Sequence, residues 1–139
     1  MRLILLFACC FLGLNIRAQT ETAQSGEPFD ARLLAVYEET YLENLQLHNP
    51  MLLQRWHYYL DHAYTVLDWP EEKGDIKALP VVYITDVKNI NILALEQSQP
   101  LYRDWDKPVF FRINDSRQVL MYHAGSNFNR DFQNWLQSR

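Results

Sequence analysis

The amino-acid sequence predicts an α+β domain made of a helical hairpin, a mainly antiparallel sheet of four to five strands and a C-terminal helix. Two amphipathic helical segments come first, followed by several short runs rich in β-branched and aromatic residues. A third amphipathic helical segment ends the chain. Strands and helices do not alternate regularly, so the pattern favours segregated helices and an antiparallel sheet over repeated βαβ units.

The first predicted helix starts after Asp30, whose carboxylate can accept hydrogen bonds from the first free N–H groups. The second starts at Asn49 and Pro50, where asparagine can cap and the missing N–H of proline costs nothing, and it runs to about Leu60. Because only two or three residues separate these helices, they are expected to form an antiparallel pair. The apolar residues on one face of the first helix are Leu34, Tyr37, Tyr41 and Leu45.

Five segments have the composition of strands. The first three are 63–67, 81–85 and 90–95. The second helix could also continue through the first of them, and the third alternates only partly. The clearest signal is a β-hairpin of 109–113 and 118–123, because the loop at 114–117 that joins its two strands is rich in turn-forming residues.

The last predicted helix follows the hairpin. Ser126 can cap its first turn. Phe128, Phe132, Trp135 and Leu136 then recur at helical spacing, so they predict one buried stripe.

Residues 1–18 have the features of a secretory signal peptide. Arg2 precedes an apolar run over 3–14, and Ala18 supplies a small residue at the cleavage site. The run is too short for a membrane span. A lipid anchor at Cys9 is the alternative, but the apolar stretch before it is short, so we expect cleavage after Ala18 and export to the periplasm or the exterior.

The mature chain is expected to be a polar leader at 19–28 followed by a single domain at 29–139. Hydrophobic residues make up 48% and aromatic residues 14% of the sequence, which favours a packed globule over disorder. Both cysteines, Cys9 and Cys10, lie in the signal. The mature protein therefore has no thiol for a disulfide, a nucleophile or a metal site.

The charge balance of the mature chain is acidic. Without Arg2 and Arg17 it has 11 basic and 17 acidic residues, a net charge of −6. Since it also lacks a cluster of Lys and Arg, it is not expected to bind nucleic acid or an anionic membrane surface. No second long apolar run occurs, so no span is expected in the mature chain.

Two resemblances add context. The order Pro108, strand, turn, strand, Gly125 and helix resembles the end of a thioredoxin fold, but the Cys-x-x-Cys motif of that family is missing. The signal ending in Ala-Gln, the run 89–93 and the segment 108–132 resemble small exported proteins of Bacteroidota, most of them uncharacterised. This second resemblance implies export into a bacterial envelope setting and no particular chemistry.

Histidines are the first candidates for chemistry. His57 and His62 flank Asp61, but residues five apart on a helix diverge by roughly 140°, so a zinc site is not expected. Instead, His57 can pair with Asp61 across one turn, and His62 can offset the negative end of the helix. His123 precedes the last helix and could help its free N–H groups hold an anion, unless Ser126 simply caps that helix.

Serine and carboxylate chemistry is not favoured. No serine lies in a G-x-S-x-G elbow. Asp104 and Asp106 flank Trp105, but Pro108 stands where a calcium loop needs its third acid, and the domain is small for a glycosidase cleft. We expect no metal site and no cofactor.

The loop around Tyr102, Arg103 and Trp105 is the predicted binding surface, since aromatic and arginine side chains dominate interface energies. In the alternative interpretation, its aromatic residues pin the loop to the core. With His123, these residues form the candidate binding set.

The predicted function is a non-enzymatic binding or interaction module of the bacterial envelope or exterior. The alternative is a small cofactor-free, hydrolase-like enzyme centred on His123 or on His57, Asp61 and His62. An enzyme needs ionisable groups with perturbed pKa values converging in a pocket. A binding module needs an exposed apolar or aromatic patch.

Overall fold

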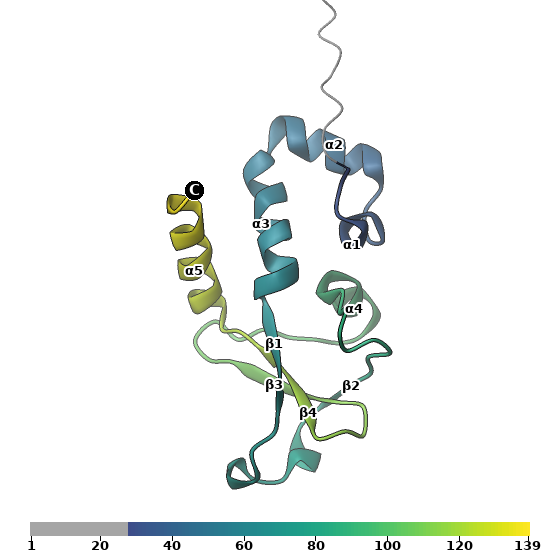
Figure 1. The fold of residues 1–139 in the computed structure, drawn as a ribbon, viewed down its shortest axis with the longest axis vertical. Helices are drawn as coiled ribbons and strands as arrows, with labels where there is room; N and C mark the ends of the chain where they lie inside the picture. The colour runs from purple at the N-terminus through teal and green to yellow at the C-terminus, as the bar shows by residue number, and fades with distance from the viewer. Residues whose placement is uncertain (1–27) are drawn as a thin grey trace, which may run out of the picture.

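The computed structural model describes residues 28–139; the predicted signal peptide and nearly all of the predicted leader lie outside the described residues. Helix α3 runs directly into strand β1, and helix α5 leaves strand β4, so these two helices lie side by side at one end of the sheet (Figure 1). In chain order the elements are α1 (Ala31–Leu34), α2 (Glu39–His48), α3 (Pro50–His62), β1 (Tyr64–Asp68), the 3₁₀ turns η1 (Glu71–Lys73) and η2 (Ile76–Ala78), β2 (Val81–Val82), α4 (Ile92–Ser98), β3 (Val109–Ile113), β4 (Gln118–Tyr122) and α5 (Gly125–Gln137).

The four strands form one mixed sheet in the order β1-β4-β3-β2. Strand β4 pairs antiparallel with both β1 and β3, so that Val66 and Phe111 both lie opposite Leu120. Strand β2 pairs parallel with β3, and α4 lies in the connection between them. The predicted α+β domain with a mainly antiparallel sheet is therefore confirmed, and the parallel pairing of β2 is a minor departure.

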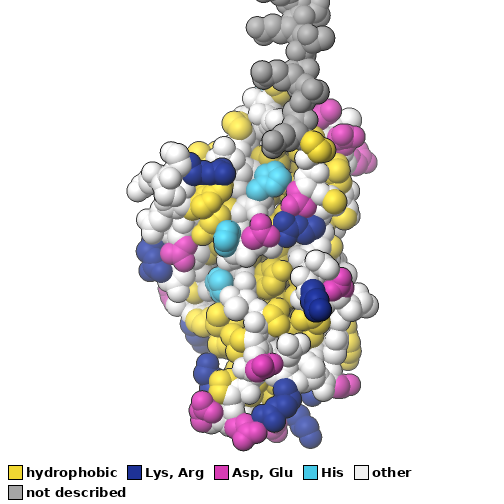
Figure 2. All heavy atoms as spheres, viewed as in Figure 1, with side chains coloured by type: hydrophobic (Ala, Val, Ile, Leu, Met, Phe, Trp, Pro, Cys, Tyr) yellow, Lys and Arg dark blue, Asp and Glu magenta, His cyan; other side chains and the backbone are white. Residues whose placement is uncertain are grey.

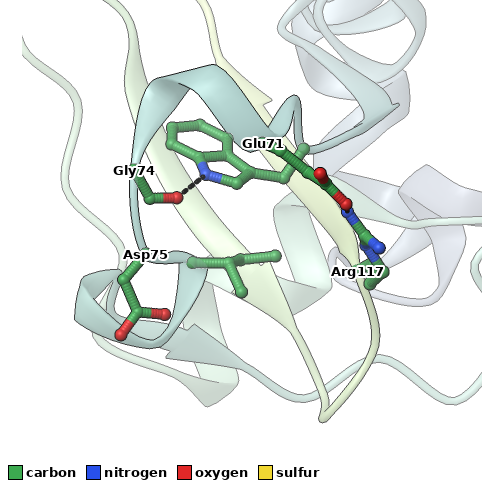
Figure 3. Close-up of a pocket in the computed structure, with 6 residues that line it drawn as sticks. Glu71, Gly74, Asp75 and Arg117 are labelled. Carbon is green, nitrogen blue, oxygen red and sulfur yellow. Dashed lines mark hydrogen bonds and ion pairs between the residues drawn. The ribbon is translucent and has the colours of Figure 1, made fainter.

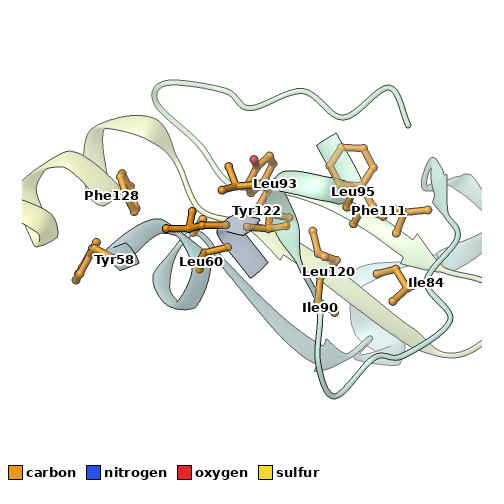
Figure 4. Close-up of a cluster of buried hydrophobic side chains, with 14 of the residues drawn as sticks. Tyr58, Leu60, Ile84, Ile90, Leu93, Leu95, Phe111, Leu120, Tyr122 and Phe128 are labelled. Carbon is orange, nitrogen blue, oxygen red and sulfur yellow. The ribbon is translucent and has the colours of Figure 1, made fainter. Parts of the chain in front are cut away.

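The core lies where one face of the sheet meets the helices. Phe111, Leu120 and Tyr122 project from that face and are at most 2% exposed. Figure 4 shows them in one continuous cluster with Leu60 of α3 and Phe128 of α5. The buried face of the sheet thus packs with side chains from helices at both ends of the chain.

The first predicted helix is interrupted and forms α1 and α2 instead. Leu33 and Leu42 are both completely buried, although nine residues separate them. In one straight helix, nine residues would turn these side chains about 180° apart. The break between the two helices lets α1 pack on α4 and α2 pack on α3, so both leucines reach the core.

The predicted strand at 90–95 is wrong, because this segment starts helix α4. The side chain of Asn91 accepts a hydrogen bond from the Ala94 N–H at 3.3 Å and so caps the helix. Ile92 and Leu95 are three residues apart and both buried, which fits a helix. Partial alternation of apolar residues concealed this spacing.

The predicted strand at 81–85 shrinks to β2, the pair Val81–Val82. Two side-chain amides replace strand partners beyond it. Gln99 bonds both the N–H and the C=O of Tyr83, at 2.8 Å each. Asn114 bonds both the N–H and the C=O of Ile84, at 3.0 and 2.8 Å. Asn114 has a φ of 51°, a left-handed conformation that asparagine tolerates well.

The other predicted elements are confirmed within a few residues. Helix α3 has the expected cap, with the Asn49 side chain accepting from the Leu52 N–H at 3.2 Å. Asp30 caps α1 in the same way, and β1, the β3–β4 hairpin and α5 form where expected. None of the helices within residues 28–139 is long and apolar enough to cross a bilayer.

Candidate functional site

Arg103 anchors the loop that joins α4 to β3. Its guanidinium lies over the rings of Tyr59, Tyr122 and Phe128, with its central carbon 4.7, 4.4 and 5.0 Å from the three ring centres. One of its N–H groups donates to the carbonyl of Ala63 at 3.3 Å. These contacts draw the middle of the loop into the junction of α3, β4 and α5.

A partly buried polar cluster surrounds this arginine. The Tyr59 hydroxyl donates to the Glu96 carboxylate at 2.5 Å and also contacts the Tyr122 hydroxyl. Burial raises the pKa of Glu96 and of Tyr59, and it lowers the pKa of Arg103. The Nε of Arg103 is buried and has no hydrogen-bond partner within residues 28–139. The charges of Glu96 and Arg103 therefore offset each other across the Tyr59 hydroxyl, without direct contact.

The same loop covers the start of α5. The backbone carbonyls of Asp104 and Trp105 accept from the N–H groups of Gly125 and Ser126, both at 2.9 Å. The predicted cap by Ser126 is wrong, because the helix already begins at Gly125 and its N-cap, Ala124, provides no side-chain bond. Loop carbonyls satisfy these two N–H groups, so they are not free to bind an anion.

The indole of Trp105 lies directly on Gly125. A Cβ atom at Gly125 would approach Trp105 Cε3 to 2.8 Å, closer than side chains pack. Glycine is therefore required here by the close approach of the ring, not by backbone conformation. Trp105 nevertheless remains 60% exposed, since only one side of its ring is covered.

Tyr102 lies elsewhere on the loop. Its ring meets the edge of Phe111 in β3, with ring centres 5.6 Å apart, and the residue is 61% exposed. Of the predicted binding set, the structure brings Arg103, Trp105 and His123 to the start of α5 and places Tyr102 over the sheet. Arg103 points inward, whereas the two aromatic residues stay largely exposed.

His123 is held between β1 and the end of α3. Its Nε2 forms a hydrogen bond with the Thr65 hydroxyl at 2.7 Å. Burial is the largest influence and lowers the pKa of His123 below its usual value of 6.5. The imidazole is therefore neutral at pH 7.

Acidification is expected to weaken the fold through His123. Because its pKa is lower in the folded state, the unfolded chain binds the proton more readily as the pH falls below about 6.5. The stability that this histidine contributes is complete above that pH and is lost as the pH falls through the folded pKa. His123→Gln should flatten the dependence of the urea midpoint on pH between pH 7 and pH 5.

His48→Gln, a substitution at the exposed end of α2, provides the matched control for that titration. If the urea midpoint depends on pH equally in the wild type and in His123→Gln, the folded state does not lower the pKa of His123. Denaturation followed by circular dichroism at each pH measures both variants under the same conditions.

The predicted pairing of His57 with Asp61 is wrong. The Asp61 carboxylate instead accepts from Arg32 of α1 at 2.7 Å, because the break after α1 brings that arginine to the end of α3. His62 packs against Tyr58, with ring centres 4.1 Å apart and the ring planes tilted by 35°. Histidine side chains lie along one face of the molecule (Figure 2), yet within residues 28–139 no three His, Cys, Asp or Glu side chains are placed to hold a metal ion.

A cavity that the sequence did not indicate lies at the far end of the sheet, between the η1–η2 segment and the β3–β4 turn (Figure 3). Its volume is about 560 Å³. Trp69 donates from its indole N–H to the Gly74 carbonyl at 2.9 Å, and Arg117 pairs with Glu71 at 2.8 Å across its rim. These charged and aromatic groups already satisfy one another, so the cavity shows no unpaired group aimed at a ligand.

Sequence reasoning missed Tyr59, Glu96 and Tyr122 as partners of Arg103. They come from α3, α4 and β4, and Tyr59 and Tyr122 are separated by 63 residues. No local spacing could have revealed this cluster. Comparisons of the chain with protein-family models, curated proteins and solved structures find no match.

Proposed function

We propose that the chain is an exported interaction module that binds a partner protein through the exposed aromatic residues of the loop at 99–108. The observation that carries this proposal is an anchored loop that still exposes Tyr102 and Trp105 by about 60% each. Arg103 and the two carbonyls that cap α5 hold the loop in place. A loop that is already ordered loses little conformational entropy on binding, so its aromatic rings can contribute fully to affinity.

Charge and the N-terminal signal indicate the kind of partner. The acidic net charge disfavours nucleic acid, and the signal features at 1–18 favour a partner in the periplasm or outside the cell. Exposed aromatic rings beside polar and charged residues are typical of protein interfaces. The proposed module needs no cofactor for this role.

The proposal is tested by capture from the envelope extract of the native host. The mature protein, carrying a photoreactive side chain at the exposed position 106 beside Trp105, should crosslink a discrete partner. Trp105→Ala and Tyr102→Ala should each lower recovery of that partner by about tenfold, because central aromatic residues dominate interface energies. Gly125→Ala should lower it as well, since the new methyl group would displace the Trp105 ring.

Tyr83→Ala is the matched control. Tyr83 is an exposed tyrosine outside the loop, and its backbone bonds to Gln99 do not depend on its ring. Circular dichroism confirms that each variant is folded before capture. Equal recovery by the wild type, Trp105→Ala and Tyr102→Ala would overturn the proposal.

One observation favours a hydrolase-like enzyme as a second candidate. A hydroxyl bonded to a neutral imidazole is the arrangement that activates a nucleophile, and Thr65 and His123 form such a pair. No carboxylate forms a hydrogen bond with His123 within residues 28–139, so the orienting acid of a triad is missing there. Turnover of an activated ester that is lost in both Thr65→Val and His123→Gln would favour this candidate over the binding module.

A further inference from the structure

The two edges of the sheet are finished differently. At the β2 edge, the strand has only two residues. The carbonyls of Pro80 and Val82 accept from β3 and the turn after it, so the outward backbone groups are those of Val81 and Tyr83. The side chain of Gln99 then bonds both backbone groups of Tyr83 on this outward side. A very short strand and a side chain that occupies the outward backbone groups both hinder another strand from adding to an edge.

The β1 edge has a regular hydrogen-bonding pattern. The His123 N–H donates to the Ala63 carbonyl at 3.0 Å, and the Trp69 N–H donates to the Arg117 carbonyl at 2.9 Å. In an antiparallel pair, hydrogen-bonded positions occur at every second residue. The odd-numbered residues from 63 to 69 therefore direct their backbone groups to β4.

The even-numbered residues of β1 point their backbone groups the other way, away from the sheet. These residues are Tyr64, Val66 and Asp68, and their N–H and C=O groups have no hydrogen-bond partner within residues 28–139. The segment 64–67 contains no lysine, proline or charge. This edge therefore lacks the protection that the β2 edge has.

We propose that β1 binds the β1 edge of a second copy of this chain, so that two sheets join into one across a twofold axis. An antiparallel register centred on Val66 places Val66 opposite its counterpart and Tyr64 opposite Asp68 of the second copy. The backbone groups of Tyr64, Val66 and Asp68, which point away from the sheet, then all fall at hydrogen-bonded positions. The contact is isologous, because the same edge serves both copies.

Charge complementarity favours this occupant. Asp68 is exposed and forms no ion pair within residues 28–139, and neither does Lys88. Lys88 lines a cavity of about 520 Å³ together with Arg32, Tyr64 and Val66. Directly opposite residues of paired strands project from the same face. The register therefore brings Asp68 of the second copy beside Tyr64 and toward Lys88, and the twofold axis repeats this pair.

Sedimentation equilibrium of the mature protein tests the proposal. We expect a concentration-dependent dimer, with Asp68→Lys weakening association by about tenfold because it affects two symmetric charge pairs. The double variant Asp68→Lys with Lys88→Glu should restore association. Glu43→Lys, which makes the same charge change on α2, is the matched control and should dimerise like the wild type.

Amide hydrogen exchange measures the pairing of the backbone itself. The N–H groups of Tyr64 and Val66 should become protected as the protein concentration rises, whereas the Tyr83 N–H should not change. A chain that stays monomeric at about 1 mM would overturn the proposal, since the dissociation constant of the dimer would then be larger than about 1 mM. A dimer that is indifferent to Asp68→Lys and leaves the Val66 amide unprotected would overturn it as well.

Discussion

Replacing Phe128 with alanine is expected to lower the free energy of unfolding by about 3–5 kcal/mol, the usual cost of deleting a buried aromatic side chain. Phe128 is 2% exposed. Its ring packs on Tyr58 and Tyr59, with ring centres 5.5 and 5.3 Å away, and it also supports the guanidinium of Arg103. Urea denaturation followed by far-UV circular dichroism measures the loss.

Phe128→Leu is the control for that measurement. It retains most of the apolar volume, so its cost should be clearly smaller than that of the alanine variant. The alanine variant should also loosen the loop at 99–108, because it removes one of the three rings that hold Arg103. A loss below about 1 kcal/mol for Phe128→Ala would contradict the assignment of this ring to the core.

Elements that depend on local signals could be predicted from the sequence. Pro50 follows a capping Asn49, four turn residues join β3 to β4, and Phe128 and Phe132 repeat at helical spacing. Each signal acts within a few residues, so tertiary contacts do not need to be known. These predictions are confirmed for that reason.

Elements decided by tertiary packing could not be predicted. A continuous helix through Tyr37 satisfies the local periodicity, but only a break lets Leu33 and Leu42 both be buried. Segment 90–95 alternates well enough to resemble a strand, yet the cap at Asn91 and packing on α1 make it helical. Local pattern and global packing disagree at these positions, and packing prevails.

In the candidate site, too, local sequence signals predict some features, and tertiary packing decides the others. The composition of the loop around Tyr102 and Trp105 indicated a surface of interest, and the structure leaves both rings largely exposed. The inward role of Arg103 depends on Tyr59 and Tyr122, which are far away in the sequence. An arginine near aromatic residues in a loop gives no local sign of which rings it will meet.

Arg103→Ala is expected to lower the free energy of unfolding by about 2–3 kcal/mol. It removes cation–π contacts with three rings, a hydrogen bond to Ala63 and the packing of a half-buried aliphatic stem. Arg103→Met retains the stem and also removes the buried Nε that lacks a partner, so its cost should be about half as large. Urea denaturation of both variants separates packing from charge.

The pH dependence of the alanine variant distinguishes the charge of Arg103 from its shape. Burial is the largest influence on the pKa of Glu96 and raises it above the usual 4.5, whereas the charge of Arg103 lowers it, so removing the arginine raises this pKa further. A carboxyl whose pKa is raised by folding favours the folded state below the unfolded pKa and loses that contribution as the pH rises through the folded pKa. The cost of Arg103→Ala should therefore be larger at pH 7 than near pH 4.

Glu96→Gln removes the group that titrates. In that background, the cost of Arg103→Ala should no longer vary between pH 7 and pH 4, because no half-buried carboxylate remains to be offset. If the variation persisted, another group would have to face the guanidinium, and Glu96 would not be the charge that Arg103 offsets. If Glu96 is left intact and Arg103→Ala costs the same free energy of unfolding at pH 7 and pH 4, Arg103 acts through packing alone.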